Sequence, residues 1–361
     1  MRLTILTGLL SITTTACLAD VGGGDCVGER CKNQPDAGMG SATSDCTTTN
    51  TTEKTTNLVL RTESDFANLP TGCWSLNANL RLEGTAITSL AKLGKLVDVN
   101  DLELVDTSLT TIDAKEQLKV YGSLLVSGNS KLVSLANLAV KKWDGQTQGG
   151  SFTVAYTVRN NAALTNIDAL KYIQKVDGDL RITDDAKLGM IELGELTSVG
   201  GAVVVSNTAA THINFSQLTQ VGRVEITTNT ALTEVHGFGA AQIVGDFILR
   251  GNPALTTIGA MSSLTSIGGA LTIDDNDALT DLTSLTGSMQ RVFGAVTITG
   301  NANLTALGQV SHFQQVGTST ITNNAKLPNC KAVEVDHCVP NSTVTISGNL
   351  AQNNCNCWCG I

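Results

Sequence analysis

Pairs of aliphatic residues separated by one residue recur along the chain from about residue 80 to residue 349, mostly every 22 to 25 residues. A representative unit is V-T-I-T-G-N-A-N-L-T-A-L, from Val296 to Leu307. Alternation with a period of two places both aliphatic side chains of each pair on one face of a short strand. Self-similarity over such a period predicts a solenoid in which each unit forms one coil and stacks on its neighbours.

An asparagine follows each aliphatic pair and is expected to bend the chain. Its side-chain amide both donates and accepts hydrogen bonds, so stacked copies can satisfy the backbone groups that a buried turn exposes. Thr85 and Thr107 take this place in the first two units. The predicted ladder consists of Asn129, Asn161, Asp185, Asn207, Asn229, Asn252, Asn276, Asn301, Asn324 and Asn349.

The residue between the two aliphatic residues of each pair is expected to face outward. The predicted outward row consists of Arg81, Glu103, Leu125, Thr157, Arg181, Val203, Glu225, Ile248, Thr272, Thr297, Thr320 and Thr345. It mixes charges with aliphatic residues and ends in a threonine ladder, which is typical either of a binding face or of an ordinary solvated strand face. The row contains no cluster of acids and bases, and His212, His236, His312 and His337 fall at unrelated repeat positions. The sequence therefore predicts no catalytic residues and no enzyme.

Composition and charge argue against some classes of partner. The formal net charge is −9, and only 15% of the 361 residues are charged. This balance argues against nucleic acid as a partner and against electrostatic docking on anionic lipid. No stretch is long enough to predict a transmembrane helix.

The first twenty residues are typical of an export signal. One arginine, a short apolar run and small residues precede Cys17, which predicts a signal peptide over 1–16. The sequence T-T-A-C resembles a bacterial lipobox, although Thr14 stands where leucine is preferred. The expectation is lipidation at Cys17 and an outer-membrane or cell-surface location, with membrane contact through the lipid alone. Cleavage after Ala19 and free secretion is the alternative.

The remaining chain divides by composition. Residues 17–56 are rich in glycine and threonine and predict a flexible tether. A solenoid domain is expected over 57–361, with an N-terminal cap at 57–79, repeats at 80–349 and a C-terminal cap at 350–361. Thr62, with Asp65 three residues on, predicts a helix start within the first cap.

No cysteine lies between Cys73 and Cys330, so all ten stand toward the two ends of the chain, which predicts disulfides in the caps of an exported protein. Cys46 is expected to pair with Cys73, Cys26 with Cys31, and Cys330 and Cys338 with two of Cys355, Cys357 and Cys359. Without Cys17 the number is odd, so one thiol is left free or pairs between molecules. The run C-N-C-W-C-G alternates faces in a strand, which suits disulfides better than a metal or redox motif.

Two further features are candidates for function. The step from Asn129 to Asn161 is 32 residues, and the insertion places Trp143 and Phe152 on a glycine- and glutamine-rich segment. Insertions in solenoids lie on loops, so these aromatic residues either anchor a partner or fold onto their own coil. Asp274–Asp277 and Thr183–Ala186 suit either a stacked Ca²⁺ site or ordinary polar turns, of which the turns are favoured; the prediction is no metal and no cofactor.

The repeat phrase, together with F-A-N-L-P-T-G-C-W-S-L-N-A-N-L-R-L from Phe66 to Leu82, resembles the receptor L-domain family. The resemblance covers roughly residues 57 to 349. It implies an all-β, right-handed, leucine-rich-repeat-like β-solenoid with disulfide-stapled end caps, on a bacterial cell-surface lipoprotein. The function expected is non-enzymatic recognition or adhesion toward a protein or glycan ligand. The alternatives are a structural envelope spacer without a specific ligand and a polysaccharide-active enzyme.

Overall fold

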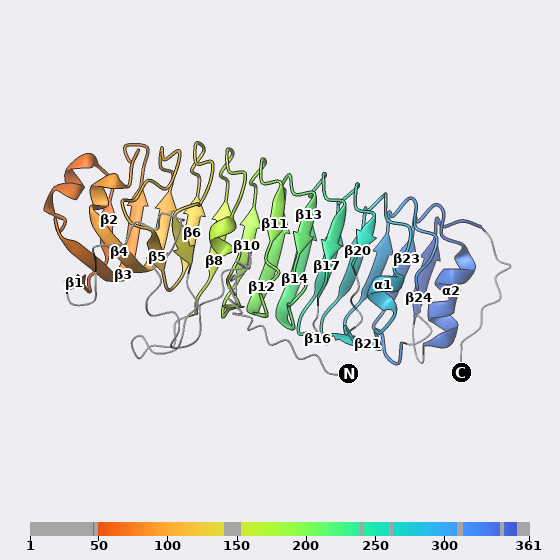
Figure 1. The fold of residues 1–361 in the computed structure, drawn as a ribbon. Coiled ribbons are helices and arrows are strands. Elements are labelled where there is room, and N and C mark those ends of the chain that lie inside the picture. Colours follow the sequence, from red (N-terminus) through yellow and green to blue (C-terminus); the bar gives the residue numbers. More distant parts are fainter. Residues whose placement is uncertain are drawn as a thin grey trace, which may run out of the picture. The chain divides into compact units, whose positions relative to one another are not determined.

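A computed structural model of the chain describes residue 46 and residues 50–140, 153–238, 242–259, 261, 263–308, 313–339 and 343–351. All of them belong to one of the two compact units of the chain, Asp45–Ile361. This unit is a β-solenoid of about 12 turns, mostly β with few helices (Figure 1). No helix among the described residues is long and apolar enough to cross a membrane.

The aliphatic pairs form the broad wall of the solenoid, as predicted. Neighbouring strands of this wall are parallel and pair in register from one coil to the next. The strands of the broad wall are β2 (Leu58–Leu60), β3 (Cys73–Glu83), β4 (Lys95–Val105), β6 (Leu124–Ser127), β8 (Tyr156–Arg159), β10 (Leu180–Thr183), β12 (Ser198–Ser206), β14 (Gln220–Thr227), β17 (Phe247–Arg250), β20 (Leu271–Asp274), β22 (Val296–Thr299), β23 (Ser319–Thr322) and β24 (Val344–Ser347).

A second row of short strands precedes the broad wall in most coils. Because β3, β4, β12 and β14 are long enough to run through both rows, the described strands of the two rows count as one 20-stranded sheet. The short strands are β1 (Thr52–Lys54), β5 (Leu118–Val120), β7 (Leu138–Val140), β9 (Lys175–Val176), β16 (Gln242–Ile243), β19 (Ser266–Ile267) and β21 (Arg291–Val292).

A narrow wall follows the asparagine turn. Its strands form a separate four-stranded parallel sheet within the described residues. They are β11 (Met190–Glu192), β13 (His212–Asn214), β15 (Glu234–His236) and β18 (Thr257–Ile258). The central residue of β11, β13 and β15 is buried, so the flanking residues of each strand face outward.

The turn from the broad wall to the narrow wall depends on one residue with positive φ. This residue directly precedes the ladder position, and it is most often glycine, asparagine or aspartate, which tolerate the left-handed conformation. From the third coil onward, the residues at this position are Gly128, Asn160, Asp184, Asn207, Thr228, Gly251, Asp275, Gly300, Asn323 and Gly348.

The ladder itself is buried and continuous over most of the stack. The Oδ1 atom of each ladder residue accepts a hydrogen bond from the backbone N–H of the ladder residue one coil earlier, as between Asn301 and Asn324 at 3.1 Å. Each amide nitrogen also donates to a carbonyl of the preceding coil, as from Asn276 to Leu249 at 2.9 Å. Asn129, Asn161, Asp185, Asn229, Asn252, Asn276, Asn301, Asn324 and Asn349 all take part.

The prediction of Asn207 as a ladder residue is wrong. Thr208 takes the place, is buried, and donates from its backbone N–H and its hydroxyl to Asn229 Oδ1 at 3.1 and 2.8 Å. Asn207 is instead the positive-φ residue before the ladder, with φ of 52°. In the first two coils Thr107 is buried in the ladder, as predicted, whereas Thr85 is exposed.

The same one-residue slip affects the outward row. Val203 is buried and pairs with the inward Leu180, whereas Val204 pairs with the outward Arg181. The identity of the outward residue at this coil is therefore Val204, not Val203. Three consecutive valines show no alternation of polar and apolar residues, so only the distance from Asn207 predicted which valine faces outward. A shift of one residue along a strand exchanges its two faces.

Aliphatic side chains from the three walls fill the interior. Near the middle of the stack they are joined by a column of phenylalanines. The rings of Phe215 and Phe238 lie 5.6 Å apart and those of Phe238 and Phe247 5.9 Å apart. The glycine step packs backbone directly on backbone, because a Cβ on Gly222 would lie 2.5 Å from the carbonyl oxygen of Gly201.

The N-terminal cap covers the first coil. A 3₁₀ helix spans Glu63–Asn68 and begins with the predicted Thr62–Asp65 capping box. Backbone N–H groups of Arg61 and Thr62 donate to the Asp65 carboxylate and lower its pKa. Fully buried Trp74 donates from its indole nitrogen to the carbonyl of Leu93 at 2.9 Å.

The disulfide Cys46–Cys73 joins the chain to the start of β3, as predicted. The predicted C-terminal bound of the tether, residue 56, is however wrong. The strand β1 pairs in parallel with β3, so residues 52–54 belong to the solenoid. The threonine-rich composition of this segment is typical of a linker, although residues 52–54 form a strand that covers the edge of the first coil.

The predicted bounds of the C-terminal cap, 350–361, are wrong, because α2 (Asn329–Cys338) lies within the segment assigned to the repeats and contacts β24. Cys330 and Cys338 are both disulfide-bonded. Their proposed partners Cys355, Cys357 and Cys359 lie outside the described residues, as do Cys17, Cys26 and Cys31. Shorter helical turns occur along the stack at Ala91–Leu93, Asp168–Leu170 and α1 (Thr283–Thr286).

Candidate functional site

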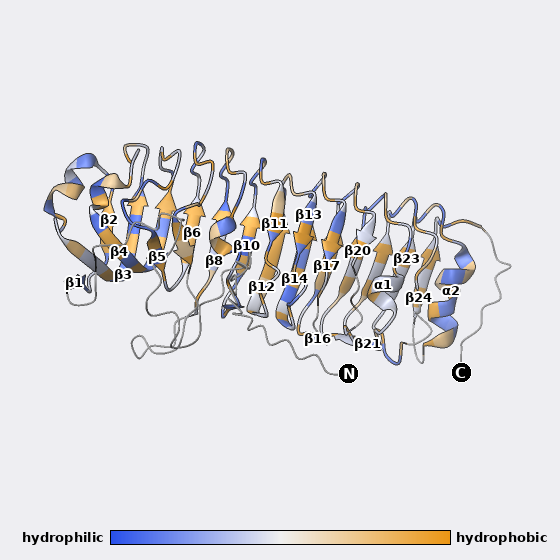
Figure 2. Cartoon of the chain, in the orientation of Figure 1, coloured by the Kyte–Doolittle hydropathy of each residue, from blue (hydrophilic) through white to orange (hydrophobic). Residues whose placement is uncertain are grey.

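The outward row forms a line of side chains across the broad wall. Parallel pairing places one residue of each successive coil side by side, from Arg81 through to Thr345. Neighbouring strands of a sheet lie ~4.8 Å apart, so the row presents a regular series of groups at that spacing. In Figure 2, hydrophilic and hydrophobic bands alternate along these strands.

Charged side chains dominate the N-terminal end of this row. Arg81 forms ion pairs with both Glu83 and Glu103. Asn79 donates to Glu103 at 2.6 Å, and Arg61 pairs with Glu83. These contacts neutralise the charges locally, and half-exposed pairs of this kind contribute little net stability.

The middle of the row mixes charge with aliphatic surface. Leu125 and Ile248 are half-buried, and their side chains lie on the outward face of the wall rather than in the core. Arg181 pairs with Asp179 at 2.7 Å, and Glu225 pairs with Arg223 at 2.9 Å. Apolar side chains rimmed by charges are the kind of surface that a partner can cover.

The C-terminal third is a double row of small polar residues. Thr272, Thr297, Thr320 and Thr345 stand in register, as predicted. A second column runs beside them two residues later, and within it the hydroxyls of Thr299 and Thr322 lie 3.0 Å apart.

A groove of about 360 Å³ lies on the row of short strands, where β7 ends at the predicted insertion. Leu138, Val140 and Tyr172 are among its lining residues. Tyr172 is 71% exposed, and the ammonium of Lys171 lies 5.4 Å from its ring centre. The insertion itself, with Trp143 and Phe152, lies outside the described residues.

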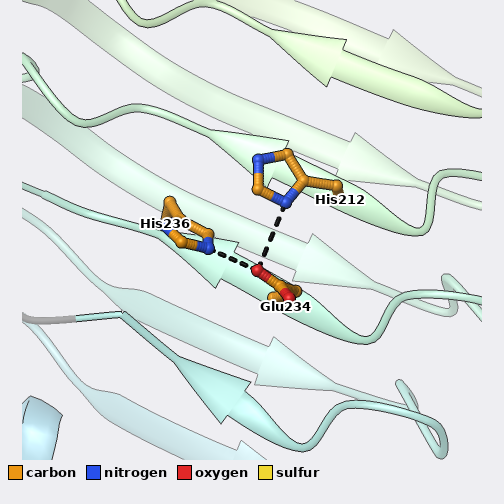
Figure 3. A group of neighbouring side chains, drawn as sticks. All are labelled: His212, Glu234 and His236. Atoms are coloured by element: carbon orange, nitrogen blue, oxygen red, sulfur yellow. Dashed lines mark hydrogen bonds and ion pairs between the residues drawn. The ribbon is translucent and has the colours of Figure 1, made fainter.

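A cluster of titratable side chains stands on the narrow wall. His212 on β13 pairs in register with Glu234 on β15, and His236 follows Glu234 on the same outward face. We call His212, Glu234 and His236 the His–Glu cluster. Figure 3 shows both imidazole rings pointing toward the carboxylate of Glu234. His212 Nδ1 lies 3.5 Å from Glu234 Oε2, and His236 Nε2 hydrogen-bonds to the same oxygen.

Two further residues support the cluster from neighbouring positions. Glu192 on β11 places its carboxylate 3.3 Å from His212 Nε2. Asn214 donates to the other oxygen of Glu192 at 3.0 Å and accepts from the backbone N–H of Ser216 at 3.0 Å. Each nitrogen of His212 therefore faces a different carboxylate.

The charge state of Glu234 follows from these contacts. The hydrogen bond from His236 is the largest influence and lowers the pKa of the Glu234 carboxyl below its ordinary value; His212 acts in the same direction. Glu234 is therefore ionised at neutral pH and presents an anionic oxygen between two imidazoles.

Among the described residues, the His–Glu cluster is the one group of three or more potential metal ligands, with ligand atoms all within 4.8 Å of one another. The two segments that would form a stacked Ca²⁺ site do not lie on adjacent coils. The coils of Asp185 and Asn276 are separated by those of Thr208, Asn229 and Asn252, and both residues face into the ladder. Asp274 instead pairs with Arg250 at 2.8 Å.

The sequence prediction that the four histidines fall at unrelated positions is wrong for His212 and His236, whose rings lie 4.7 Å apart. They stand at the two outward positions of consecutive three-residue strands, H-I-N and E-V-H. The period-two alternation around Ile213 and Val235 carries this signal, because it predicts that the residues on either side of each buried residue face outward. His337 lies on α2, and His312 is outside the described residues.

No protein-family model matches the chain, and searches of curated proteins and of solved structures find no match either.

Proposed function

We propose that this protein is a non-enzymatic recognition or adhesion protein of the cell envelope, and that it binds a protein or glycan through the outward row of the broad wall. The observation that carries the proposal is the set of half-buried aliphatic residues, Leu125 and Ile248, held in register with Arg181 and Glu225 on a rigid sheet. A rigid surface loses little conformational entropy when a ligand binds. The groove beside Tyr172 offers an additional apolar contact at the site of the insertion.

The proposed location is the outer membrane or the cell surface, with Cys17 as the lipid anchor. The export-like first twenty residues and the resemblance to the receptor L-domain family support it. So do the disulfide Cys46–Cys73 and the disulfide-bonded Cys330 and Cys338, because disulfides persist in oxidising compartments. Protease treatment of intact cells tests the location. Surface display predicts loss of the wild-type protein and release of Cys17→Ala into the medium; protection in intact cells would place the protein in the periplasm.

Ligand binding is tested with isolated cell envelopes from a strain that lacks the protein. Labelled full-length protein is titrated onto untreated envelopes, onto protease-treated envelopes and onto periodate-oxidised envelopes. Recognition predicts saturable binding that one of the two treatments removes, which also identifies the ligand as protein or glycan. Binding that rises without saturation, or that neither treatment changes, would favour a structural spacer.

A further inference from the structure

The His–Glu cluster offers three ligand atoms of the kinds that zinc takes in proteins. Two imidazole nitrogens and one carboxylate oxygen make up the protein ligands of many zinc sites, with a fourth position left to water or to another ligand. Calcium and magnesium prefer oxygen ligands throughout, so the two histidines select against them. Imidazole-rich sites suit the late first-row transition metals generally, with zinc the one to test first.

The distances fit a shared ion. Zinc bonds of ~2.1 Å at tetrahedral angles separate two ligand atoms by roughly 3.4 Å. The separation of 3.5 Å between His212 Nδ1 and Glu234 Oε2 is already of that size. His236 Nε2 hydrogen-bonds to the same oxygen, and a small rotation of the His236 ring would lengthen this contact to the separation expected for two zinc ligands. All three side chains are partly exposed, so a cation can reach them from solvent.

The surroundings assign the nitrogen that His212 would use. Its Nε2 faces Glu192, and a histidine that binds metal through one nitrogen commonly donates its other N–H to a carboxylate. Glu192 is itself held by Asn214, which is fixed on the backbone of Ser216. This leaves Nδ1 of His212 directed at Glu234, toward the position that the ion would occupy.

The strands hold these groups at fixed separations. β11, β13 and β15 are consecutive parallel strands in register, and Ile191, Ile213 and Val235 anchor them in the core. Ligands carried on packed strands lose little freedom when a metal binds, which favours affinity.

We propose that His212, Glu234 and His236 form a binding site for a zinc-class divalent cation, with Glu192 as the residue that orients His212. The proposal is independent of ligand recognition by the broad wall, because the cluster lies on the narrow wall.

Zinc titration calorimetry tests the proposal on full-length protein without a polyhistidine tag, after treatment with a chelator and its removal. The wild type is expected to bind one zinc ion per chain in a saturable isotherm. His212→Gln and His236→Gln should lose that isotherm. Glu192→Gln should keep the stoichiometry but bind ~10–100-fold more weakly, because an orienting carboxylate is removed while the ligands stay. His337→Gln on α2 is the matched control and should bind like the wild type.

Circular dichroism of each variant establishes that the solenoid is intact, and substitution of zinc by cobalt identifies the ligand atoms. A tetrahedral cobalt spectrum without thiolate charge transfer supports the site. Absence of saturable zinc binding by the wild type would overturn the proposal. So would unchanged affinity in both His212→Gln and His236→Gln, or a thiolate charge-transfer band, which would assign the metal to cysteines.

Discussion

Asn252 Oδ1 accepts two hydrogen bonds from Asn229 one coil earlier, from the backbone N–H at 3.0 Å and from the side-chain amide at 3.3 Å. Asn252 in turn donates from its amide nitrogen to Ile226 at 3.0 Å and to Arg250 at 3.1 Å. Both asparagines are fully buried. One side chain therefore satisfies a donor of the preceding coil, a carbonyl of the preceding coil and a carbonyl of its own, which ties the stack together at every turn.

Asn252→Ala should destabilise the solenoid strongly. The substitution leaves the backbone N–H of Asn229 buried without a partner, at ~1–3 kcal/mol for an unsatisfied group, and it also removes the hydrogen bonds that the Asn252 amide donates to the carbonyls of Ile226 and Arg250. Denaturant unfolding should therefore show a loss of about 3 kcal/mol or more. Asn303→Ala removes an amide from an exposed turn and is the matched control, with an expected change within about 0.5 kcal/mol. Equal effects of the two substitutions would contradict the ladder.

Substitution of Thr208 should destabilise its coil more than substitution of Asn207. Thr208→Val keeps the shape but removes the hydroxyl that donates to Asn229, and should cost ~1–2 kcal/mol. Asn207→Gly preserves the positive φ and removes an exposed side chain with its exposed hydrogen bond to Asp184, so it should change stability by less than about 0.5 kcal/mol. Thermal unfolding of the two variants decides the assignment; a larger loss from Asn207→Gly would restore Asn207 to the ladder.

Asp185 should make the solenoid less stable as the pH rises. Its Oδ1 accepts hydrogen bonds from the backbone N–H and the side-chain amide of Asn161. Its Oδ2 therefore takes the place of the side-chain nitrogen that donates to a carbonyl in the other coils, and Oδ2 has no hydrogen-bond partner. Burial raises the pKa of Asp185 from 3.8 to about 6. The folded state therefore holds the proton more tightly than the unfolded state, and stability is lost as the pH rises between about 4 and 6.

Asp185→Asn isolates that effect. The amide supplies the missing donor at every pH, so the variant should match the wild type near pH 4 and exceed it by ~2–3 kcal/mol at pH 7. Paired denaturant titrations across this range give the difference directly. A difference that does not change with pH would show that Asp185 stays ionised in the fold.

Loss of the Cys46–Cys73 disulfide should loosen the N-terminal cap. The bond closes a loop with a sequence separation of 27, for which chain entropy predicts ~3 kcal/mol. Cys46→Ser with Cys73→Ala should lower the melting temperature and raise hydrogen exchange in β1 and β3 while leaving β22 and β23 protected. Uniform deprotection along the stack would instead indicate that the coils unfold as one cooperative unit.

The repeat pattern predicted the stack of coils, the aliphatic core and nearly every ladder residue, because all three depend on alternation and on a fixed period. It failed at the coil of Val203 to Thr208, where three valines in a row carry no face information. It also missed β1, because a strand that only covers an edge needs no aliphatic pair. The His–Glu cluster was missed because it depends on which residues of two separate three-residue strands become neighbours, and this is fixed by the register between coils rather than by either segment alone.

The most direct test of the proposed function compares two double variants of the full-length protein on isolated envelopes. Leu125→Glu with Ile248→Glu adds two charges to the outward row, and Met190→Glu with Thr257→Glu adds two charges to the narrow wall. Recognition by the broad wall predicts that the first variant loses saturable binding while the second keeps the half-saturation concentration of the wild type. Equal binding by both variants would show that the outward row is not the recognition surface.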